Sequence, residues 1–277
     1  MKSENRYLFQ GHAVAASAQF RRFKDQPIKV DNCLKNVSAA IPADGGCLTA
    51  SSERQEIRHE DRVLYAFDSA FAGVTGDYLD QHAAFLETNK EHRNQELGVF
   101  TACEALLKNL SVLDNRLFVE TLQSQLTAED TRDGRPVRFF AKKPPVIAGV
   151  RLENKPLVVE IDIDDVFLGL PTKHDVVREH EKNDAFRKEC QRRHYAAHQN
   201  FIVTSIVKTI RFPDGEPDGV TVLGNHVLKV ENFGYIFFGE LLIGETTRRL
   251  TMLRLQLGSD TGGSSCSGES KPNGQTT

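Results

Sequence analysis

The sequence contains no tryptophan, only two methionines and no two cysteines in a C-x-x-C spacing. It has no apolar run long enough to cross a bilayer, and no apolar segment near its start that would serve as a signal peptide. These absences argue against a zinc ribbon, a thioredoxin-like redox site, a membrane span and an exported precursor. We therefore expect a cytoplasmic protein.

A strong charge of either sign is also lacking. The formal net charge is -3, which argues against nucleic-acid binding, because a nucleic-acid backbone requires a basic surface. The hydrophobic content of 39% and the charged content of 26% are ordinary for a soluble globular protein. With 277 residues, the chain is long enough to bury a sizeable core in one domain.

The sequence has five cysteines, at positions 33, 47, 103, 190 and 266. An odd number of cysteines cannot all be paired in disulfides within one chain. Free, reduced thiols are expected because no export signal is present. Cys33 and Cys47 are close enough in sequence to form a disulfide if the compartment were oxidising.

Three short phrases with a shared pattern indicate the architecture. They are LDNRL at 113–117, LENKPL at 152–157 and LGNHVL at 223–228. Each places an asparagine (Asn115, Asn154 or Asn225) in a short gap between β-forming runs. Asparagine tolerates the positive φ that tight hairpin turns require. The phrases therefore predict three β-hairpins in a mainly antiparallel β fold, sandwich or barrel-like.

The rest of the chain completes a single β-rich domain over residues 1–257. Residues 6–20 predict a first strand with unusually small side chains. In 117–126 the apolar residues fall on both sides of the predicted strand, which indicates partial cover on both faces. In the last strand, Thr251, Leu253, Leu255 and Leu257 are the better candidates for the core.

Two helices and a tail are expected beside the strands. Asp77 could cap a short helix over 78–92. A long charged helix is predicted over 172–199, starting at a capping-box pair formed by Thr172 and Asp175. Residues 258–277 are rich in Gly, Ser, Thr and Pro with almost no apolar content, which predicts disorder.

Two stretches resemble a pattern found in uncharacterised bacterial β-rich proteins. They are NLSVLDNRLFVETLQSQLTAE at 109–129 and PPVIAGVRLENKPLVVEID at 144–162. The closing strands, GYIFFGELLI and RRLTMLRLQLGS, are similar to the C-terminal strands of that group. The resemblance implies a β-rich fold and a bacterial source, and it implies no ligand or catalytic residue.

Two sets of residues could bind a metal ion. Cys190, His194 and His198 are spaced four apart in the predicted helix, and two neighbours such as His194 and His198 could chelate one metal. Ordinary packing explains the same spacing, and no Glu follows the first histidine as in H-E-x-x-H. The second set, Glu160, Asp162 and Asp164, alternates along a strand and could attract calcium. A solvated acidic strand face is the alternative.

Other polar residues carry weaker signals. His12 or His226 could act as a general base, but no nucleophile motif accompanies either. Basic doublets that could converge on an anionic partner stand at 21–22, 142–143, 192–193 and 248–249. No cofactor-binding motif is present, and none is expected.

We interpret the sequence as that of a non-catalytic structural or protein-interaction protein. Its contact surface would be the predicted helix at 172–199 or an exposed sheet edge, with self-association as one form of contact. One alternative is a metal-dependent hydrolase or metal-binding protein that uses His194 and His198 or the acidic strand. The other is a small-ligand-binding β-barrel, which the 17 phenylalanines favour.

Overall fold

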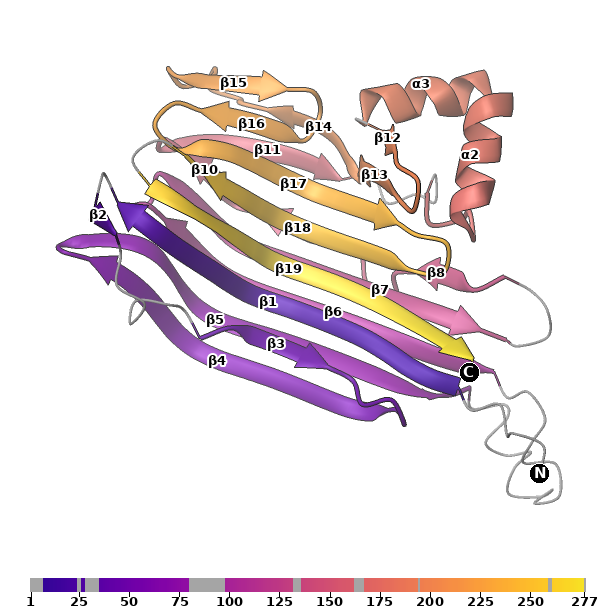
Figure 1. Cartoon of the computed structure of the whole chain (residues 1–277). Coiled ribbons are helices and arrows are strands. Elements are labelled where there is room, and N and C mark those ends of the chain that lie inside the picture. Colours follow the sequence, from indigo (N-terminus) through magenta and orange to yellow (C-terminus); the bar gives the residue numbers. More distant parts are fainter. Residues whose placement is uncertain are drawn as a thin grey trace, which may run out of the picture.

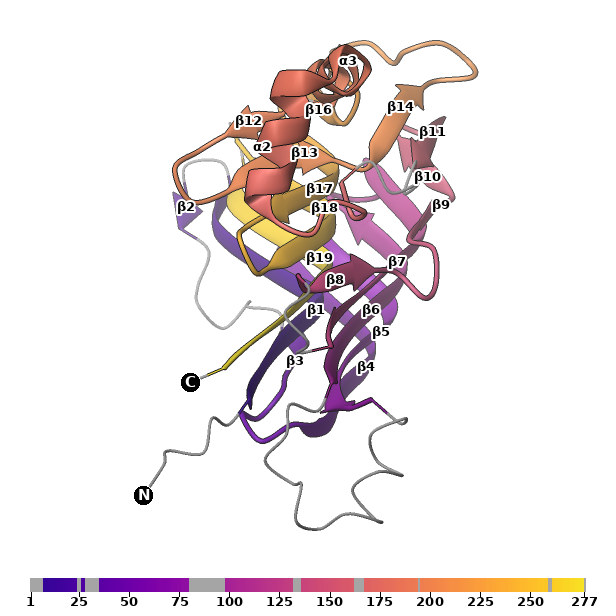
Figure 2. The same cartoon turned by 90° about the vertical axis from the view of Figure 1, so that its right-hand side faces the viewer.

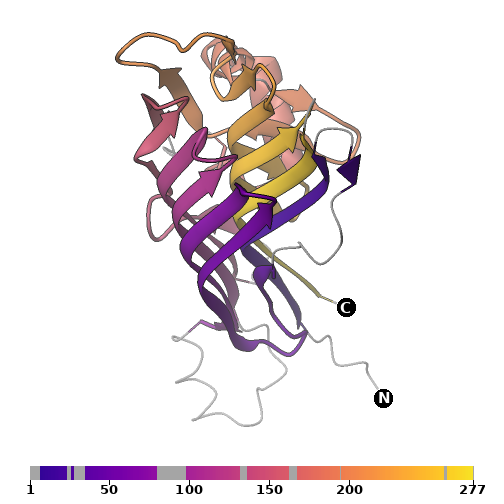
Figure 3. The same cartoon turned by 90° about the vertical axis from the view of Figure 1, so that its left-hand side faces the viewer.

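The structure is a computed structural model that describes residues 7–23, 26–27, 35–79, 98–131, 136–161, 167–193, 195–258 and 261–276. These residues form two antiparallel β-sheets that pack face to face, as the two views in Figures 2 and 3 show. The predicted mainly β, antiparallel architecture is therefore confirmed, and its form is a sandwich.

Sheet A forms the front layer in Figure 1 and has the strand order β12-β13-β17-β18-β19-β1-β2. Strand β16 also pairs with β17, β15 pairs with β16, and β3 pairs with β1. The bounds of its strands are β1 Tyr7–Phe23, β2 Gln26–Pro27, β3 Val37–Ala40, β12 Ala196–Ala197, β13 Ile202–Ser205, β15 Val220–Leu223, β16 Val227–Val230, β17 Gly234–Ile243, β18 Arg248–Leu257 and β19 Thr261–Thr276.

Sheet B forms the second layer, with the order β14-β11-β10-β7-β6-β5-β4. Strands β8 and β9 pair with β7. The bounds are β4 Gly46–His59, β5 Arg62–Tyr78, β6 Val99–Val112, β7 Leu117–Asp130, β8 Arg138–Phe140, β9 Val146–Ala148, β10 Val150–Leu152, β11 Lys155–Ile161 and β14 Val207–Arg211.

The three asparagine phrases lie where the chain reverses sharply between antiparallel neighbours: β6 and β7, β10 and β11, and β15 and β16. Asn115 and Asn154 have φ of 65° and 62°, the left-handed conformation that the turns require. At the third reversal Gly224, with φ of 67°, takes this conformation in place of Asn225. Glycine adopts it without a steric penalty, so the neighbouring asparagine is not needed for it.

A row of residues interrupts the regular alternation of the long strands of sheet A. Gly239 of β17, Met252 of β18 and Gly268 of β19 lie next to one another, and the strand register is the same on both sides of them. Gly239 and Gly268 have φ of 58° and 66°, which favours glycine. We call these three residues the kink row. Because each strand leaves its pleat at one residue here, residues three apart, rather than two, share a face across the row.

Sheet B has a matching interruption. It passes through Asn109 of β6, Glu120 of β7 and Gly149 between β9 and β10, and Asn109 and Gly149 have φ of 52° and 63°. Fully buried residues of β7 therefore fall at odd numbers before the interruption and at even numbers after it: Leu117, Val119, Leu122, Ser124 and Leu126. The mixed apolar pattern of 117–126 reflects this shift in alternation.

Small residues allow the two sheets to approach closely. The predicted first strand is confirmed as β1, and its Ala13, Ala16 and Ala18 are buried. At Gly11 an added Cβ would lie 2.6 Å from Cγ1 of Val74 in the facing sheet. Larger side chains at these glycine and alanine positions would push the two sheets apart.

The predicted disorder of residues 258–277 is wrong for residues 261–276, which form strand β19. This strand lies between β18 and β1 (Figure 1). It pairs with β1 along its length and with β18 from Gly263 to Ser270. Its hydroxyls cross the interface: Ser267 Oγ is 2.8 Å from Tyr65 Oη, and Ser270 Oγ is 2.7 Å from Ser124 Oγ. Small side chains and paired backbone, not large apolar groups, hold this segment.

The long helix predicted over 172–199 is also wrong. The structure has two short helices instead, α2 Lys173–Lys182 and α3 Asp184–Arg192, which run in different directions in Figure 1. Asn183 separates them with an extended backbone, and its side-chain oxygen accepts hydrogen bonds from the N–H groups of Ala185 and Phe186. Such a cap starts a new helix in a new direction. The capping box of Thr172 and Asp175 is confirmed at the start of α2.

A buried arginine fixes the segment before α2 to sheet A. Arg248, the first residue of β18, is fully buried and donates hydrogen bonds to the carbonyls of Leu170, Pro171, Gly244 and Thr247. Burial lowers the pKa of Arg248 to about 10.

The short helix predicted over 78–92 falls almost entirely outside the described residues. Tyr78 ends β5, and residues 80–92 lie outside the described residues. Neither α2 nor α3, the helices of the described ranges, is long and apolar enough to cross a membrane.

Candidate binding surface on sheet A

The histidine pair predicted to bind metal loses its helical geometry. Helix α3 ends at Arg192, and His198 follows strand β12, where its ring lies 4.8 Å from that of Phe201. His194 lies outside the described residues, and Cys190, which belongs to α3, is fully buried. Burial raises the pKa of the Cys190 thiol to about 12, which disfavours the thiolate that a metal would need.

The acidic strand is only partly described. Glu160 lies in β11 and forms an ion pair with Arg211 of β14, with 3.0 Å between Oε1 and Nη2. Asp162 and Asp164 lie outside the described residues. Within the part of the chain that is described, no three His, Cys, Asp or Glu side chains are grouped so that they could hold a metal ion.

The basic doublets whose side chains the structure describes do not converge. Arg193 and Arg248 are buried, whereas Arg192 pairs with Glu189 on α3 and Lys143 pairs with Glu104 on β6. The side chains of the 21–22 doublet lie outside the described residues. Of the two candidate general bases, His226 is buried, and His12 belongs to the network described next.

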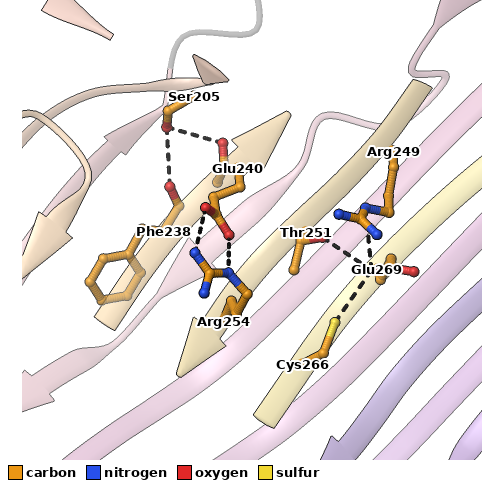
Figure 4. A network of polar contacts seen from close by, with 9 residues as sticks. Ser205, Phe238, Glu240, Arg249, Thr251, Arg254, Cys266 and Glu269 are labelled. Atoms are coloured by element: carbon orange, nitrogen blue, oxygen red, sulfur yellow. Dashed lines mark hydrogen bonds and ion pairs between the residues drawn. The ribbon is translucent and has the colours of Figure 1, made fainter. Parts of the chain in front are cut away.

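A network of polar side chains lies on the face of sheet A that points away from sheet B, and Figure 4 shows its core. Glu269 of β19 is its centre. Its carboxylate accepts hydrogen bonds from Thr251 Oγ1 at 3.2 Å and from Cys266 Sγ at 3.4 Å. It also forms an ion pair with Arg249 Nε at 3.8 Å, and His12 Nδ1 lies 3.7 Å from it. Four side chains from three strands therefore converge on one carboxylate.

The network keeps Glu269 ionised. Burial alone would raise the pKa of Glu269, but the contact with His12, the charge of Arg249 and the hydrogen bond from Cys266 together outweigh it and lower the pKa below its ordinary value. Burial and the neighbouring carboxylate raise the pKa of the Cys266 thiol far above its ordinary value. Cys266 is consequently a hydrogen-bond donor and not a nucleophile.

A second, adjoining pair extends the network across β17. Arg254 donates through Nε and Nη2 to the two carboxylate oxygens of Glu240, the latter bond at 2.8 Å. Its guanidinium carbon also lies 3.7 Å from the centre of the Phe237 ring. A bidentate ion pair stacked on an aromatic ring fixes the arginine in one orientation.

The kink row brings these groups to one face. Cys266 and Glu269 are three apart in β19, as are Thr251 and Arg254 in β18, and each pair flanks a residue of the kink row. In an uninterrupted strand, residues three apart point to opposite faces. Sequence alternation therefore placed Thr251 with the core, whereas its hydroxyl donates to Glu269 on the outer face.

The surface keeps exposed donors despite its internal pairing. The side chains of His12, Arg249 and Arg254 are 44%, 43% and 38% exposed, whereas those of Glu269 and Glu240 are 12% and 16% exposed. The carboxylates lie beneath these side chains and orient them, and the two guanidinium groups and the imidazole face outward. We call His12, Glu240, Arg249, Arg254 and Glu269 the sheet A patch.

Sequence reasoning missed most of this patch. It named His12 and the doublet that contains Arg249, but it had no means of joining them to Glu269, because the segment around Glu269 reads as a disordered tail. The available signal was that Gly239 and Gly268 directly precede Glu240 and Glu269, since a glycine inside a strand can mark an interrupted alternation.

Comparison with models of protein families, with curated proteins and with solved structures found no match. The chemistry of the patch therefore carries the functional argument by itself.

Proposed function

We propose that this chain is a non-catalytic protein-interaction protein that binds a partner protein through the sheet A patch. The observation that carries the proposal is the state of Arg254, which is held by Glu240 and Phe237 and still 38% exposed. A side chain that is already ordered loses little entropy on binding. Arginine next to an aromatic ring is typical of the residues that dominate binding energy at interfaces.

The charges of the patch favour a partner with an acidic or carbonyl-rich surface. Arg249 and Arg254 point outward, and Lys271 is exposed in the register position opposite His12. The two carboxylates, Glu240 and Glu269, already have cation partners within the patch. The donors that remain open at the surface would pair with oxygen acceptors of the partner.

Binding is favoured over catalysis because the reactive groups of the patch are held in unreactive states. The pKa of Cys266 is raised, and Thr251 donates its hydrogen bond to a carboxylate rather than to a histidine. The direct contact between the sheets at Gly11 gives no support to a ligand-filled barrel interior. The bacterial source and the cytoplasmic location stay predictions.

The test compares the wild type with Arg254→Ala and with Arg249→Ala/Arg254→Ala as affinity baits in cells that express the protein. We expect a protein that the wild type captures and that the double variant loses. Calorimetry with that purified protein should show about tenfold or weaker binding for Arg254→Ala, a typical loss for an interface arginine.

Arg211→Ala is the matched control, because Arg211 is a 61% exposed arginine on sheet B that also pairs with a glutamate. It should bind the partner like the wild type. Equal binding by the double variant and the wild type would refute the proposal.

A further inference from the structure

Strand β4 forms one border of sheet B. It pairs with β5 from Gly46 to His59, and no strand of the described residues pairs with its other side. Figure 1 shows β4 along the lower border of the molecule. Most of its side chains are exposed, and its place at the end of sheet B leaves the backbone groups of its outer side without a strand partner among the described residues.

Edge strands of natural proteins are usually protected from pairing by shortness, by proline or by inward-pointing charges. Strand β4 is long and contains no proline. Its charged residues are Glu53, Arg54, Glu56 and Arg58, and all are exposed. Arg54 and Arg58 both pair with Glu56, whereas Glu53 has no ion-pair partner among the described residues.

The alternation of β4 restricts how it could pair with another strand. Ala50 and Ser52 are its less exposed residues in one half, and Gln55 and Ile57 are those in the other half. The inward side therefore changes from even to odd numbers near Arg54, where sheet B has its interruption. An antiparallel partner strand must place inward residues opposite inward residues, or half of its side chains would point to the wrong face.

A second copy of β4 meets this requirement in one register. In that register Ser52 lies opposite Gln55 of the second copy, and Ala50 lies opposite Ile57 of the second copy. The same register places Glu53 opposite Arg54 of the second copy, and two-fold symmetry repeats this pair. A shift of two residues in one direction places Glu53 opposite Glu56, and in the other direction it places inward Ser52 opposite outward Glu53.

We propose that the chain forms a symmetric dimer in which two β4 strands pair antiparallel about an axis between Glu53 and Arg54, so that sheet B continues from one copy into the other. The strand pairing supplies hydrogen bonds to the open backbone groups of β4. The two Glu53–Arg54 pairs fix the register, because opposite charges directly across an antiparallel pair stabilise it and like charges destabilise it. This surface is separate from the sheet A patch and does not depend on it.

The first test exchanges the two charges. Light scattering and analytical ultracentrifugation over a concentration series should show that the wild type is a dimer. Glu53→Arg and Arg54→Glu should each weaken it about tenfold or more, since each creates two like-charge contacts. The double exchange Glu53→Arg/Arg54→Glu should return the dissociation constant to within about threefold of the wild type.

Lys208→Glu is the control, because Lys208 is an exposed cation on β14, at the other border of sheet B. It should leave the dimer unchanged. All variants should keep the wild-type circular dichroism spectrum, since the Arg54 side chain is 67% exposed. A wild type that stays monomeric, or a double exchange as weak as the single ones, would overturn the proposal.

A second test measures the register directly in a Cys47→Ser background. Thr49 lies opposite Arg58 of the second copy, and directly opposed residues have Cα atoms about 4.5–5.5 Å apart, which a disulfide can bridge. Thr49→Cys/Arg58→Cys should therefore give a disulfide-linked dimer under mild oxidation. Thr49→Cys/Glu56→Cys, shifted by two residues, should remain largely unlinked. Equal linkage of both variants would contradict the proposed register.

The dimer tests and the affinity experiment can fail independently of each other. Loss of the β4 dimer would leave the binding by Arg249 and Arg254 unaffected, and loss of that binding would leave the dimer unaffected.

Discussion

At the scale of single residues, the sheet A patch depends on the ionised state of Glu269. Its pKa is lowered in the folded protein, while an unfolded carboxyl titrates near 4.5. The charged form therefore stabilises the fold above about pH 4.5, and this stabilisation is lost as the pH falls through the lower folded pKa. The contact with His12 and the charge of Arg249 favour the ionised carboxylate.

Glu269→Gln should remove this dependence on pH. The difference in the free energy of unfolding between the wild type and Glu269→Gln should be constant above about pH 5.5 and should shrink below about pH 4.5. Urea denaturation at a series of pH values measures it, with Glu231→Gln at an exposed position as the reference. A difference that does not change between about pH 6 and pH 3 would contradict the assignment.

The glycine at position 11 makes a second residue-scale prediction. A Cβ at Gly11 would lie 2.6 Å from Val74 and 2.8 Å from Thr101, both in the facing sheet. Gly11→Ala should therefore lower the free energy of unfolding by about 1–3 kcal/mol, the usual cost of overpacking. Gly258→Ala, where no atom lies within 4 Å of the added Cβ, should change it by less than about 0.5 kcal/mol. Thermal and urea unfolding of the two variants would check the contrast.

At the scale of elements, Asn183 decides that the charged segment after Thr172 forms two helices. Charge content and an apolar stripe predicted one continuous helix there, and both features persist within α2 and α3. Charge content and an apolar stripe do not predict the position at which a side chain such as Asn183 caps a new helix. Each helix buries its own residue, Val176 in α2 and Cys190 in α3.

Asn183→Ala should destabilise α3 by about 0.5–2 kcal/mol, the cost of a lost N-cap. Asn183→Asp should keep most of the stability, because aspartate accepts the same hydrogen bonds. Hydrogen exchange of the amides of Ala185 and Phe186, which the Asn183 side chain caps, provides the measurement. Slow exchange in the alanine variant would show that the cap has no role.

At the scale of the whole molecule, β19 lies inside sheet A and joins β18 to β1. It pairs with β1, the first strand of the described chain, and with β18 near the other end. Because the pairing with β1 joins residues more than two hundred positions apart, the central part of sheet A cannot form without β19. The segment is therefore essential to the fold although its composition predicts disorder.

A chain truncated after Gly258 should fail to unfold cooperatively, because β1 and β18 would both be left with an open edge and an uncovered inner face. A synthetic peptide of residues 259–277 should restore cooperative unfolding when added in excess. Circular dichroism and thermal denaturation follow both effects. A truncated chain as stable as the full chain would show that the tail is dispensable, as its composition suggests.

Features that depend on local physics could be predicted from the sequence. Antiparallel β structure, the reversals at Asn115 and Asn154, and the capping box at Thr172 all follow from backbone preferences that act within a few residues. Only the tertiary structure decided the rest. Glu269 acquires its contact with His12, and β19 one of its two neighbouring strands, from β1, which is more than two hundred residues away in the chain. Composition describes a segment alone, whereas the stability of a small, polar strand comes from the neighbours on either side of it.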